Sequence, residues 1–455
     1  MKSEDKSGRE WTAYPDPKQA REDRWEEWRL LHASPEVWTK RMLTGLHKGI
    51  KGNKWFSLAD KVWRVSTLQA AFSKVMKNQG SAGSDGETVA AFGANLEANC
   101  AKLSEELQSG RYQRRPVRRI MIPKIGGGER PLGIPSVRDR VVETAIRMAI
   151  EPIFDVDFSP HSHGFRPGRG CQGALSTVHH QLDSGKLWVV DADIQGYYDH
   201  IDHEILLSLV EEKISDGRVL KWLRDLLKTP IFEEYQFWTP EEGSPQGSVL
   251  SPLLANLYLD GLDRELEARG IAFVRYADDF VLMSESRREA EDGLQSVRDW
   301  CAANRLQLHP GKTRLLEVTA KEGFDFLGYH FRAANHWPGE KGRKNLRTKL
   351  RPKLKRNNGR SLAKTIELIN PILRGWFHYF KYCRRWQLED ADQWVRMRLR
   401  STLRRRRKRK GRGRGADHQR WPNAYFEERG LFSLVKAHES FCESHEVLPV
   451  WQGNH

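Results

Sequence analysis

The sequence predicts an α+β fold in which a core of mixed helices and strands precedes an all-helical lobe. Between about residues 117 and 283, apolar runs of strand length alternate with stretches of helical periodicity. Two of the short strands are joined directly by a turn, which favours an antiparallel sheet. After Trp337 the strand patterns fade while helical periodicity continues, so a separate helical lobe is expected from about residue 340.

With 455 residues the chain can form two or three domains that each bury a core. We divide it into a polar lead-in that is expected to be loosely packed or mobile, then a mixed core, a helical lobe and a short tail. Order is expected to begin near Trp55. The predicted bounds are 1–54, 55–335, 340–440 and 441–455. The helical lobe contains an almost uninterrupted basic stretch over residues 396–420.

The predicted elements follow from apolar spacing and from turn residues. Helical spacing is found over 58–92, 96–107, 138–154, 205–227, 250–267, 363–382 and 386–403. A turn cluster at 80–86 interrupts the first of these stretches. Strand patterns cover two arms of a basic hairpin within 117–135, a run that ends in carboxylates at 187–194, and the pair 272–276 and 280–283. A turn-rich segment at 243–247 opens the helix that follows it.

The charge balance favours a polyanionic partner. The formal net charge is +16 and the pI is about 9.6, which would steer nucleic acid toward the protein, although contact with anionic lipid is an alternative. Five well-separated cysteines suggest neither a disulfide framework nor a zinc ribbon, so a cytoplasmic location fits. The charged N-terminus and the lack of a long apolar run predict neither secretion nor membrane spanning.

Adjacent aspartates between two apolar strands suggest a metal site. Asp278 and Asp279 repel each other and lose hydration if buried, and a divalent cation relieves both costs. Magnesium prefers oxygen ligands and is commonly held by one or two carboxylates with substrate phosphate. Asp193, at the end of another strand, would complete the set. The alternative is an exposed hairpin turn, where such residues are common.

Two Mg²⁺ ions roughly 3.5–4 Å apart would support nucleotidyl transfer. One ion lowers the pKa of a primer 3′-hydroxyl, and the other stabilises the leaving pyrophosphate in an in-line displacement.

An ordered set of motifs is the most specific signal. The segment Phe273 to Phe280 resembles the Tyr-Ala-Asp-Asp catalytic hairpin of reverse transcriptases, in the form typical of group II intron-encoded proteins. Further blocks follow in the order of that family: 122–124 with 130–135, 163–168, 193–203, 243–258, 309–313 and 326–329. The resemblance covers roughly residues 55–440 and implies a right-hand polymerase, with fingers and palm followed by a helical thumb.

Carried over by position, the resemblance implies roles for named residues. Asp193, Asp278 and Asp279 would be metal ligands, with the carbonyl of Ile194 as a possible main-chain ligand. Residues expected at the incoming deoxynucleotide are Lys124, Arg130, Ile194, Tyr198 and Gln246. Lys124 and Arg130 suit phosphate binding, and the ring of Tyr198 would exclude a ribose 2′-hydroxyl, although a packing role beside Tyr197 is the alternative.

The helical lobe resembles the maturase, or X, domain of the same proteins in the segment 368–380 and again in 421–426. Aromatic and arginine side chains at helical spacing suit stacking and phosphate contact, with ordinary core packing as the alternative. Residues expected to contact nucleic acid are Arg166, Lys312, Arg374, Trp376 and, in the basic stretch, Arg404, Arg405, Arg406 and Arg407. A solvated tail is the other interpretation of that stretch.

The resemblance implies RNA-directed DNA synthesis with magnesium on an RNA template with a DNA primer. It also implies binding of a parent group II intron RNA, help in splicing, and insertion of the intron into a DNA target. Many family members carry a C-terminal His-Asn-His endonuclease with paired cysteines, which is not seen here, so self-made nicking is not expected. The alternatives are a domesticated reverse transcriptase of phage defence or repair, and an RNA-binding splicing factor with an idle polymerase site.

Overall fold

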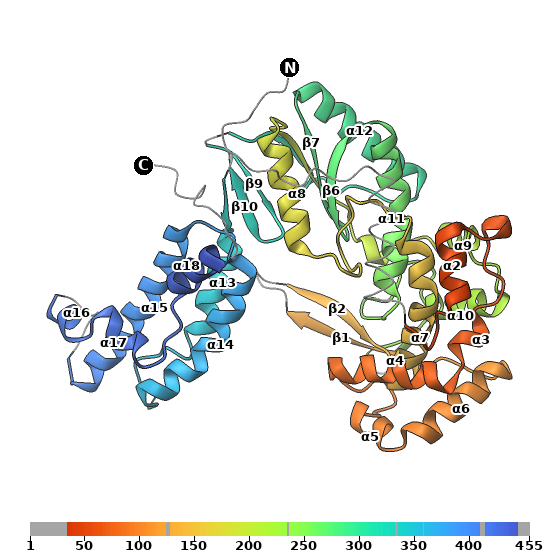
Figure 1. Ribbon diagram of the computed structural model, residues 1–455, viewed down its shortest axis with the longest axis horizontal. Helices are drawn as coiled ribbons and strands as arrows, with labels where there is room; N and C mark the ends of the chain where they lie inside the picture. The colour runs from red at the N-terminus through yellow and green to blue at the C-terminus, as the bar shows by residue number, and fades with distance from the viewer. Residues whose placement is uncertain are drawn as a thin grey trace. The chain divides into compact units, whose positions relative to one another are not determined.

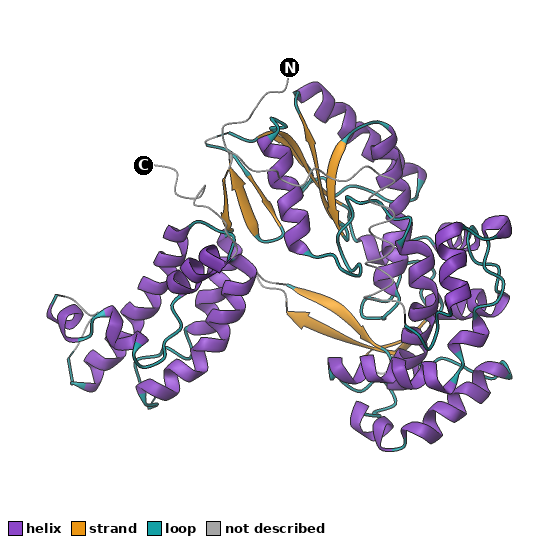
Figure 2. Cartoon of the chain, in the orientation of Figure 1, coloured by secondary structure: helices purple, strands orange, loops and turns teal. Residues whose placement is uncertain are grey.

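The computed structural model describes residues 34–123, 128–233, 236–319, 321–332, 335–357, 359–409 and 415–444. Two compact units divide the chain: residues 1–181 with 188–315, and residues 182–187 with 316–455. Helices and three small sheets make up the described regular structure (Figures 1 and 2). The α+β prediction is confirmed.

The first unit opens with helices that are ordered earlier in the chain than expected. Helix α2 (Lys40–Lys48) begins after Thr39, whose side chain caps the amide of Met42. Val37 and Trp38 are already buried, and the indole of Trp38 donates a hydrogen bond of 2.9 Å to the carbonyl of Met148. The expectation that order begins near Trp55 is therefore wrong for residues 34–53, because these apolar anchors pack among distant helices. Residues 1–33 lie outside the described residues.

Helix α7 (Val137–Asp155) forms the centre of the helical part of this unit. Apolar residues occur all round it, and most of its side chains are buried, as expected for a helix that is covered on every side. Ser136 caps its first turn by accepting from the amide of Asp139. The surrounding helices are α3 (Ala59–Val62), α4 (Val65–Asn78), α5 (Val89–Ala94) and α6 (Leu96–Gln108).

The basic hairpin forms part of a four-stranded sheet with the order β2-β1-β4-β5. Strands β1 (Val117–Pro123) and β2 (Glu129–Ile134) pair antiparallel as predicted, with Ile122 opposite Arg130. Strands β4 (Ile231–Glu233) and β5 (Gln236–Trp238) extend the sheet on the other side of β1. These two strands were not predicted, because three residues are too few for a period to show.

The expected helical stretch 205–227 is two helices, α9 (His203–Glu211) and α10 (Gly217–Leu227). Asp216 separates them and is buried. One of its carboxylate oxygens accepts from the amides of Arg218 and Val219, and the other accepts from the amides of Leu58 and Ala59. This single carboxylate therefore caps α10 and also fixes the entry to α3.

A second four-stranded sheet, with the order β6-β7-β3-β8, carries the predicted carboxylates. Its strands are β3 (Trp188–Asp193), β6 (Ala272–Tyr276), β7 (Asp279–Ser284) and β8 (Arg314–Glu317). The pairs β3–β7 and β6–β7 are antiparallel, as predicted for the catalytic sheet. Helices α11 (Ser251–Ala268) and α12 (Arg287–Ala303) pack on it, and α8 (Cys171–Asp183) precedes β3 (Figure 1).

The second unit combines a small sheet with a helical bundle. Its sheet has the order β11-β10-β9, formed by β9 (Phe324–Phe326), β10 (Tyr329–Arg332) and β11 (Asn335–Pro338). The helices are α13 (Glu340–Leu350), α14 (Leu362–Phe380), α15 (Arg385–Arg406), α16 (Ala416–Arg420), α17 (Asn423–Glu427) and α18 (Leu434–Ser444). These strands are grouped with the helices, whereas the sequence prediction placed residues up to 335 in the preceding domain.

Among the described helices, none has the combination of length and apolar composition that crossing a bilayer requires.

Candidate active site

The predicted catalytic hairpin is formed by β6, β7 and a two-residue turn. Tyr276 pairs with Asp279, so Ala277 and Asp278 form the turn itself. Ala277 has a φ of 59°, a left-handed conformation that is uncommon for a residue with a side chain and that hairpin turns usually assign to Gly or Asn. The turn is thus held in a conformation that Ala does not favour by itself.

The strand register brings the predicted carboxylates to one end of the sheet. Asp193, the last residue of β3, lies directly opposite Asp279, the first residue of β7. Side chains of directly opposed residues project from the same face, with their Cβ atoms about 4.5–5.5 Å apart. Asp278 adjoins this pair in the turn, so the adjacent Asp278 and Asp279 meet the distant Asp193 at the same strand ends.

The environment of Asp278 shows the cost of this crowding. Burial of this side chain raises the pKa of its carboxyl, and the negative charge of Asp193 raises it further. A backbone hydrogen bond, the ammonium of Lys312 and the guanidinium of Arg275 act in the opposite direction. The carboxylates are therefore close enough to interact electrostatically, and an added cation would stabilise their charged forms.

Lys312 lies at the carboxylates rather than on an outlying surface. Its Nζ donates to Oδ2 of Asp193 at 2.8 Å. The segment that carries it is fixed to the end of β3, because the amide of His309 donates to the carbonyl of Asp193 at 2.7 Å. An ammonium group at this distance demonstrates that the carboxylate of Asp193 accepts a cation.

The carbonyl of Ile194, which the resemblance implies as a possible metal ligand, lies next to the hydrogen bonds of a short bridge. Ile194 forms an isolated antiparallel bridge with Leu308. The hydrogen bonds that define the bridge join His309 to Asp193 and Gln195 to Gln307, so neither uses the carbonyl of Ile194. Its side chain is buried, which fixes the residue in place.

The donor set suits magnesium that arrives with a substrate. Within the described ranges, no group of three or more His, Cys, Asp and Glu side chains is arranged so that it could hold a metal by itself. Magnesium, however, commonly takes only one or two carboxylates and completes its shell with water and substrate phosphate. The oxygen-only ligands Asp193, Asp278 and Asp279 fit that mode of binding.

The two adjacent tyrosines have different environments. Tyr197 is buried, and its hydroxyl donates to the carbonyl of Ala255 at 2.6 Å. Tyr198 is half-buried and lines a cavity of about 380 Å³ together with Gln246. Of the two tyrosines, Tyr198 is the one that lines this cavity, and its role at the sugar stays a prediction.

The loop that contains Gln246 fits closely against the basic hairpin. The amide of Gly133 donates to the carbonyl of Gln246 at 2.6 Å. Gly247 has a φ of 113°, and a Cβ there would lie 2.0 Å from the carbonyl oxygen of Gly133. Glycine is therefore required at position 247 by the backbone conformation and by the close approach of the neighbouring chain.

Arg130, on β2 of this hairpin, is exposed. Lys124 lies outside the described residues, so the pairing of these two basic residues around a phosphate stays a prediction.

Glu143 is a residue of the site that the sequence analysis missed. This fully buried carboxylate of α7 accepts from the Ser248 hydroxyl and from the Val249 amide, both at 2.7 Å, and forms an ion pair with Arg114. It therefore anchors the end of the Gln246 loop. Helix α7 carries several other charged residues, such as Arg140, Arg147 and Glu151, so no sequence pattern singled out Glu143 as the buried, hydrogen-bonded charge.

Arg166, expected to contact nucleic acid, lies within the protein core. Its Nε forms an ion pair of 2.7 Å with Asp155, and its terminal nitrogens donate to the carbonyls of Asp155, Ser159 and Ser162. With a buried guanidinium committed to these acceptors, the expected contact is not supported. Arg166 instead closes the loop 159–166, because its planar fork satisfies several carbonyls at once.

In the second unit, Arg374 and Trp376 lie on α14 but in different surroundings. Arg374 is exposed, and its guanidinium carbon lies 4.6 Å from the centre of the Phe432 ring. Trp376 is half-buried, with its ring centre 4.9 Å from that of Phe380 and its Nε1 donating to the Gly342 carbonyl at 3.4 Å. Arg374 is thus exposed to solvent, whereas Trp376 mainly packs.

The basic stretch 396–420 is divided by burial. Arg396 and Arg400 are buried on α15, where Arg396 pairs with Asp392 and Arg400 donates to the Trp421 carbonyl. Arg404 forms an ion pair with Asp417. The exposed cations begin at the end of α15 with Arg405, Arg406, Arg407, Lys408 and Arg409, and residues 410–414 lie outside the described residues. Only part of the charge is therefore presented to a partner.

Strand-end aspartates on an antiparallel sheet, in an α+β chain that also carries a basic hairpin, are the features of a polymerase of the right-hand class. Residues 122–331 match the family described as "Reverse transcriptase (RNA-dependent DNA polymerase)". Residues 343–421 match the "Group II intron, maturase-specific domain". The chain belongs to the reverse transcriptase family, whose activity is RNA-directed DNA synthesis, and carries a group II intron maturase domain.

Two relatives illustrate the similarity. The chain is 35% identical over 289 residues to protein YkfC of Escherichia coli (strain K12), a match that covers 54% of this chain and 74% of that protein. It is 40% identical over 169 residues to the group II intron-encoded protein LtrA of Lactococcus lactis subsp. cremoris, covering 37% of this chain and 28% of LtrA. The matched region is thus most of YkfC but less than a third of LtrA.

A solved structure of telomerase from Candida albicans, in complex with a fragment of telomeric RNA, aligns with 81% of this chain and 69% of that chain. The TM-score is 0.42 and the sequence identity is 14%, so the likeness is loose.

The close approach of Gly164 to the catalytic turn gives a direct test of the site. A Cβ at position 164 would lie 2.3 Å from the amide nitrogen of Ala277, so Gly164→Ala is expected to displace the turn. We expect primer extension to slow by roughly 10- to 100-fold, because small misplacements of reacting groups are costly. Gly170→Ala in the same loop is the matched control, since a Cβ there meets nothing within 4 Å. Equal extension rates for the two variants would contradict the assignment.

Proposed function

We propose that this chain copies RNA into DNA by two-metal nucleotidyl transfer at Asp193, Asp278 and Asp279. The observation that carries the proposal is the register of β3 and β7, in which Asp193 lies opposite Asp279 with Asp278 in the adjoining turn. Three crowded carboxylates have no use in a protein that only binds RNA, because they would repel its phosphates.

Two bound Mg²⁺ ions would lower the pKa of the primer 3′-hydroxyl, which attacks the α-phosphorus, and would stabilise the departing pyrophosphate. The ions would be held at the strand ends by the carboxylates of Asp193, Asp278 and Asp279, with the carbonyl of Ile194. Arg130 and Lys124 bind the triphosphate from the basic hairpin, Arg130 through its two-pronged guanidinium. Lys312, whose ammonium contacts Asp193, contributes a further positive charge at the carboxylates.

Selection of deoxynucleotides is assigned to Tyr198 and Gln246. The two residues line the same cavity, and Tyr198 is half-buried there. Gln246 lies between Gly243 and Gly247, both with positive φ, in a loop that is fixed to the basic hairpin and to Glu143. This rigid loop would keep the sugar of an incoming nucleotide against the Tyr198 ring.

The nucleic-acid partners proposed for this chain are a group II intron RNA, an RNA template with its DNA primer, and a DNA target for intron insertion. Support comes from the match to the maturase-specific domain and from the exposed cations at the end of α15. In this role the protein would assist splicing of its intron and act in the cytoplasm as a ribonucleoprotein.

Asp278→Asn tests the proposed chemistry. We expect it to abolish RNA-templated primer extension, because it removes a metal ligand, while RNA affinity remains within about twofold, because no phosphate contact is lost. Extension and RNA binding would be measured on the same preparations. Asp191→Asn is the matched control: Asp191 lies on the same strand as Asp193 but is engaged by Arg314, and this variant should extend primers. Normal extension by the Asp278 variant would refute the site.

Tyr198→Val is expected to raise ribonucleotide incorporation relative to deoxynucleotide incorporation, since removing the ring opens space for a 2′-hydroxyl. The measured quantity is the ratio of kcat/KM for the two substrates, which a general loss of folding does not change. Tyr197→Phe serves as the control, because it removes only the hydroxyl that bonds to Ala255 and should leave the ratio unaltered. A ratio unchanged in Tyr198→Val would assign that residue to packing.

Replacing Arg405, Arg406 and Arg407 by Gln should weaken binding of structured RNA and flatten its salt dependence. Each phosphate contact contributes a log–log slope of about −0.7 for single strands and about −0.9 for B-form duplex. Affinity would be measured at several salt concentrations. The control is the charge-matched replacement of Arg287, Arg288 and Arg298, which are exposed on α12. Equal slopes for the wild type and the α15 variant would make this a solvated segment.

A further inference from the structure

Arg275 is the residue that precedes the Tyr276–Asp279 motif, and it is one of the largest side chains to be completely buried. Its exposed fraction is 0%, although it carries a positive charge next to the last residue of β6 in the catalytic hairpin. Burying a guanidinium is costly unless all of its donors find acceptors. The positions of these acceptors therefore indicate what the residue does.

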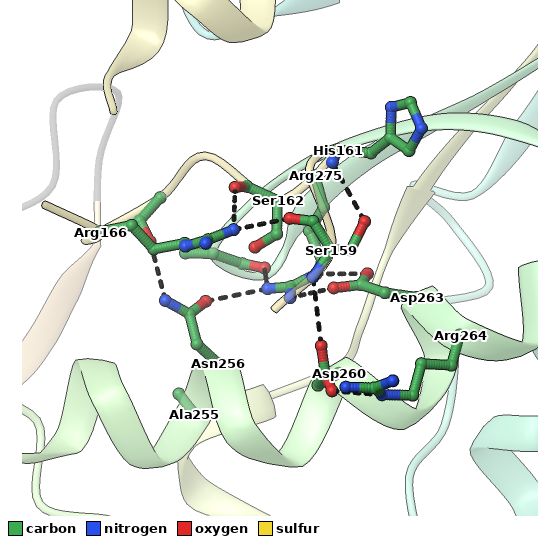
Figure 3. Close-up of polar contacts among 12 residues, drawn as sticks. Ser159, His161, Ser162, Arg166, Ala255, Asn256, Asp260, Asp263, Arg264 and Arg275 are labelled. Atoms are coloured by element: carbon green, nitrogen blue, oxygen red, sulfur yellow. Dashed lines mark hydrogen bonds and ion pairs between the residues drawn. The ribbon is translucent and has the colours of Figure 1, made fainter. Parts of the chain in front are cut away.

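The acceptors of the Arg275 guanidinium in the described structure lie on two elements, and Figure 3 shows those on α11. Its Nε donates to Oδ1 of Asp263 at 2.8 Å, and its Nη2 makes the second bond to the same carboxylate. Its Nη1 donates to Oδ1 of Asn256 at 2.9 Å and to the carbonyl oxygen of Ala277 at 3.0 Å. Asp263 and Asn256 belong to α11, whereas Ala277 is the left-handed residue of the catalytic turn.

Asn256 extends the contact to a third segment. Its Nδ2 donates to the carbonyl of Gly164 at 2.8 Å. The main chain of Arg275 also pairs with this segment, accepting from the amide of His163 at 2.8 Å and donating to the carbonyl of His161 at 2.9 Å. The loop 159–166, helix α11 and the catalytic turn are consequently fixed to one another through one guanidinium and one carboxamide.

We propose that Arg275, oriented by Asp263 and Asn256, is the positioning residue that fixes the catalytic turn, so that Asp278 and Asp279 are correctly placed before any metal or nucleotide binds. It touches neither substrate nor metal ligand side chain, and it acts through the carbonyl of Ala277. This inference rests on the proposed role of the aspartates in metal binding.

The chemistry of the side chain supports this role. A well-packed apolar pair could fill the same space without the desolvation cost of a buried ion pair, so stability alone does not explain Arg275 and Asp263. A guanidinium holds a planar fork of donors that can engage a carboxylate on one edge and two oxygens on the other. Lysine carries the same charge but cannot meet these acceptors in one plane.

The conformation of the turn shows what has to be fixed. Ala277 adopts a φ of 59°, and its neighbour Gly164 approaches so closely that a Cβ there would overlap the Ala277 amide. A residue in this sparsely populated region keeps its conformation only where the surroundings determine it. The bond from Arg275 to the Ala277 carbonyl and the contact from Gly164 restrain the turn from two sides.

The test uses the full-length protein and the variant Arg275→Lys. Hydrogen–deuterium exchange, followed in peptides that cover residues 275–281 without metal or substrate, is expected to accelerate at least about tenfold, because the turn loses its restraint. Direct titration with Mn²⁺, followed by the paramagnetic signal of the free ion, should show weaker binding. In primer extension, kcat should fall by roughly 10- to 100-fold, whereas the Kd for primer–template should stay unchanged.

Asp216→Ala is the matched control, because Asp216, like Arg275, is a buried charged residue of the first unit. Its carboxylate caps α10 and the entry to α3 instead of contacting the turn. It should lower Tm without accelerating exchange at residues 275–281. Asn256→Ala is the second variant should Arg275→Lys not fold: it keeps the Asp263–Arg275 pair and should accelerate exchange in the same peptides to a smaller extent.

Two results would overturn the inference. One is a folded Arg275→Lys protein, or a folded Asn256→Ala protein if the first does not fold, with the turn exchange and Mn²⁺ affinity of the wild type. The other is an equal acceleration in Asp216→Ala. Failure of the proposed function is a separate result, since the wild type itself would then show no Mg²⁺-dependent primer extension, whatever the exchange at the turn.

Discussion

Electrostatic repulsion among three carboxylates is the constraint on which the rest of the first unit depends. The register of β3 and β7 places Asp193 opposite Asp279, and Asp278 lies in the adjoining turn. Burial raises the pKa of the Asp278 carboxyl. Such an arrangement costs free energy in the isolated protein, so strongly paired strands must hold it together. The cation of Lys312 offsets part of this cost.

Buried ion pairs are found where loops must keep a fixed shape near this site. Arg275 with Asp263 holds the catalytic turn, Arg166 with Asp155 closes the loop 159–166, and Glu143 with Arg114 anchors the loop that carries Gln246. Loop backbone has few partners of its own, whereas a buried charged group supplies several hydrogen bonds in defined directions. Buried arginine–carboxylate pairs thus hold a loop or turn in a fixed shape at three places in this unit.

The sequence was sufficient for features that depend on local pattern. The strand ends at Asp193 and the hairpin around Asp278 were predicted because apolar runs of strand length end there, and α14 and α15 because their periodicity is long. Features set by distant partners could not be predicted: Trp38 is ordered by Met148, and Arg166 is buried by acceptors in its own loop and at Asp155. A lone arginine in a motif does not reveal whether its charge faces solvent or a carboxylate.

Counting charges therefore overestimates the surface that RNA can reach. The basic stretch of the second unit contains arginines that serve the bundle, such as Arg400 at the Trp421 carbonyl and Arg404 at Asp417, before the exposed cations begin. A buried arginine neutralised by protein acceptors releases no counterions when RNA binds, and it cannot add to the salt dependence of affinity. Within this stretch the cations at the end of α15 are exposed to a partner, whereas Arg396, Arg400 and Arg404 are engaged by the bundle.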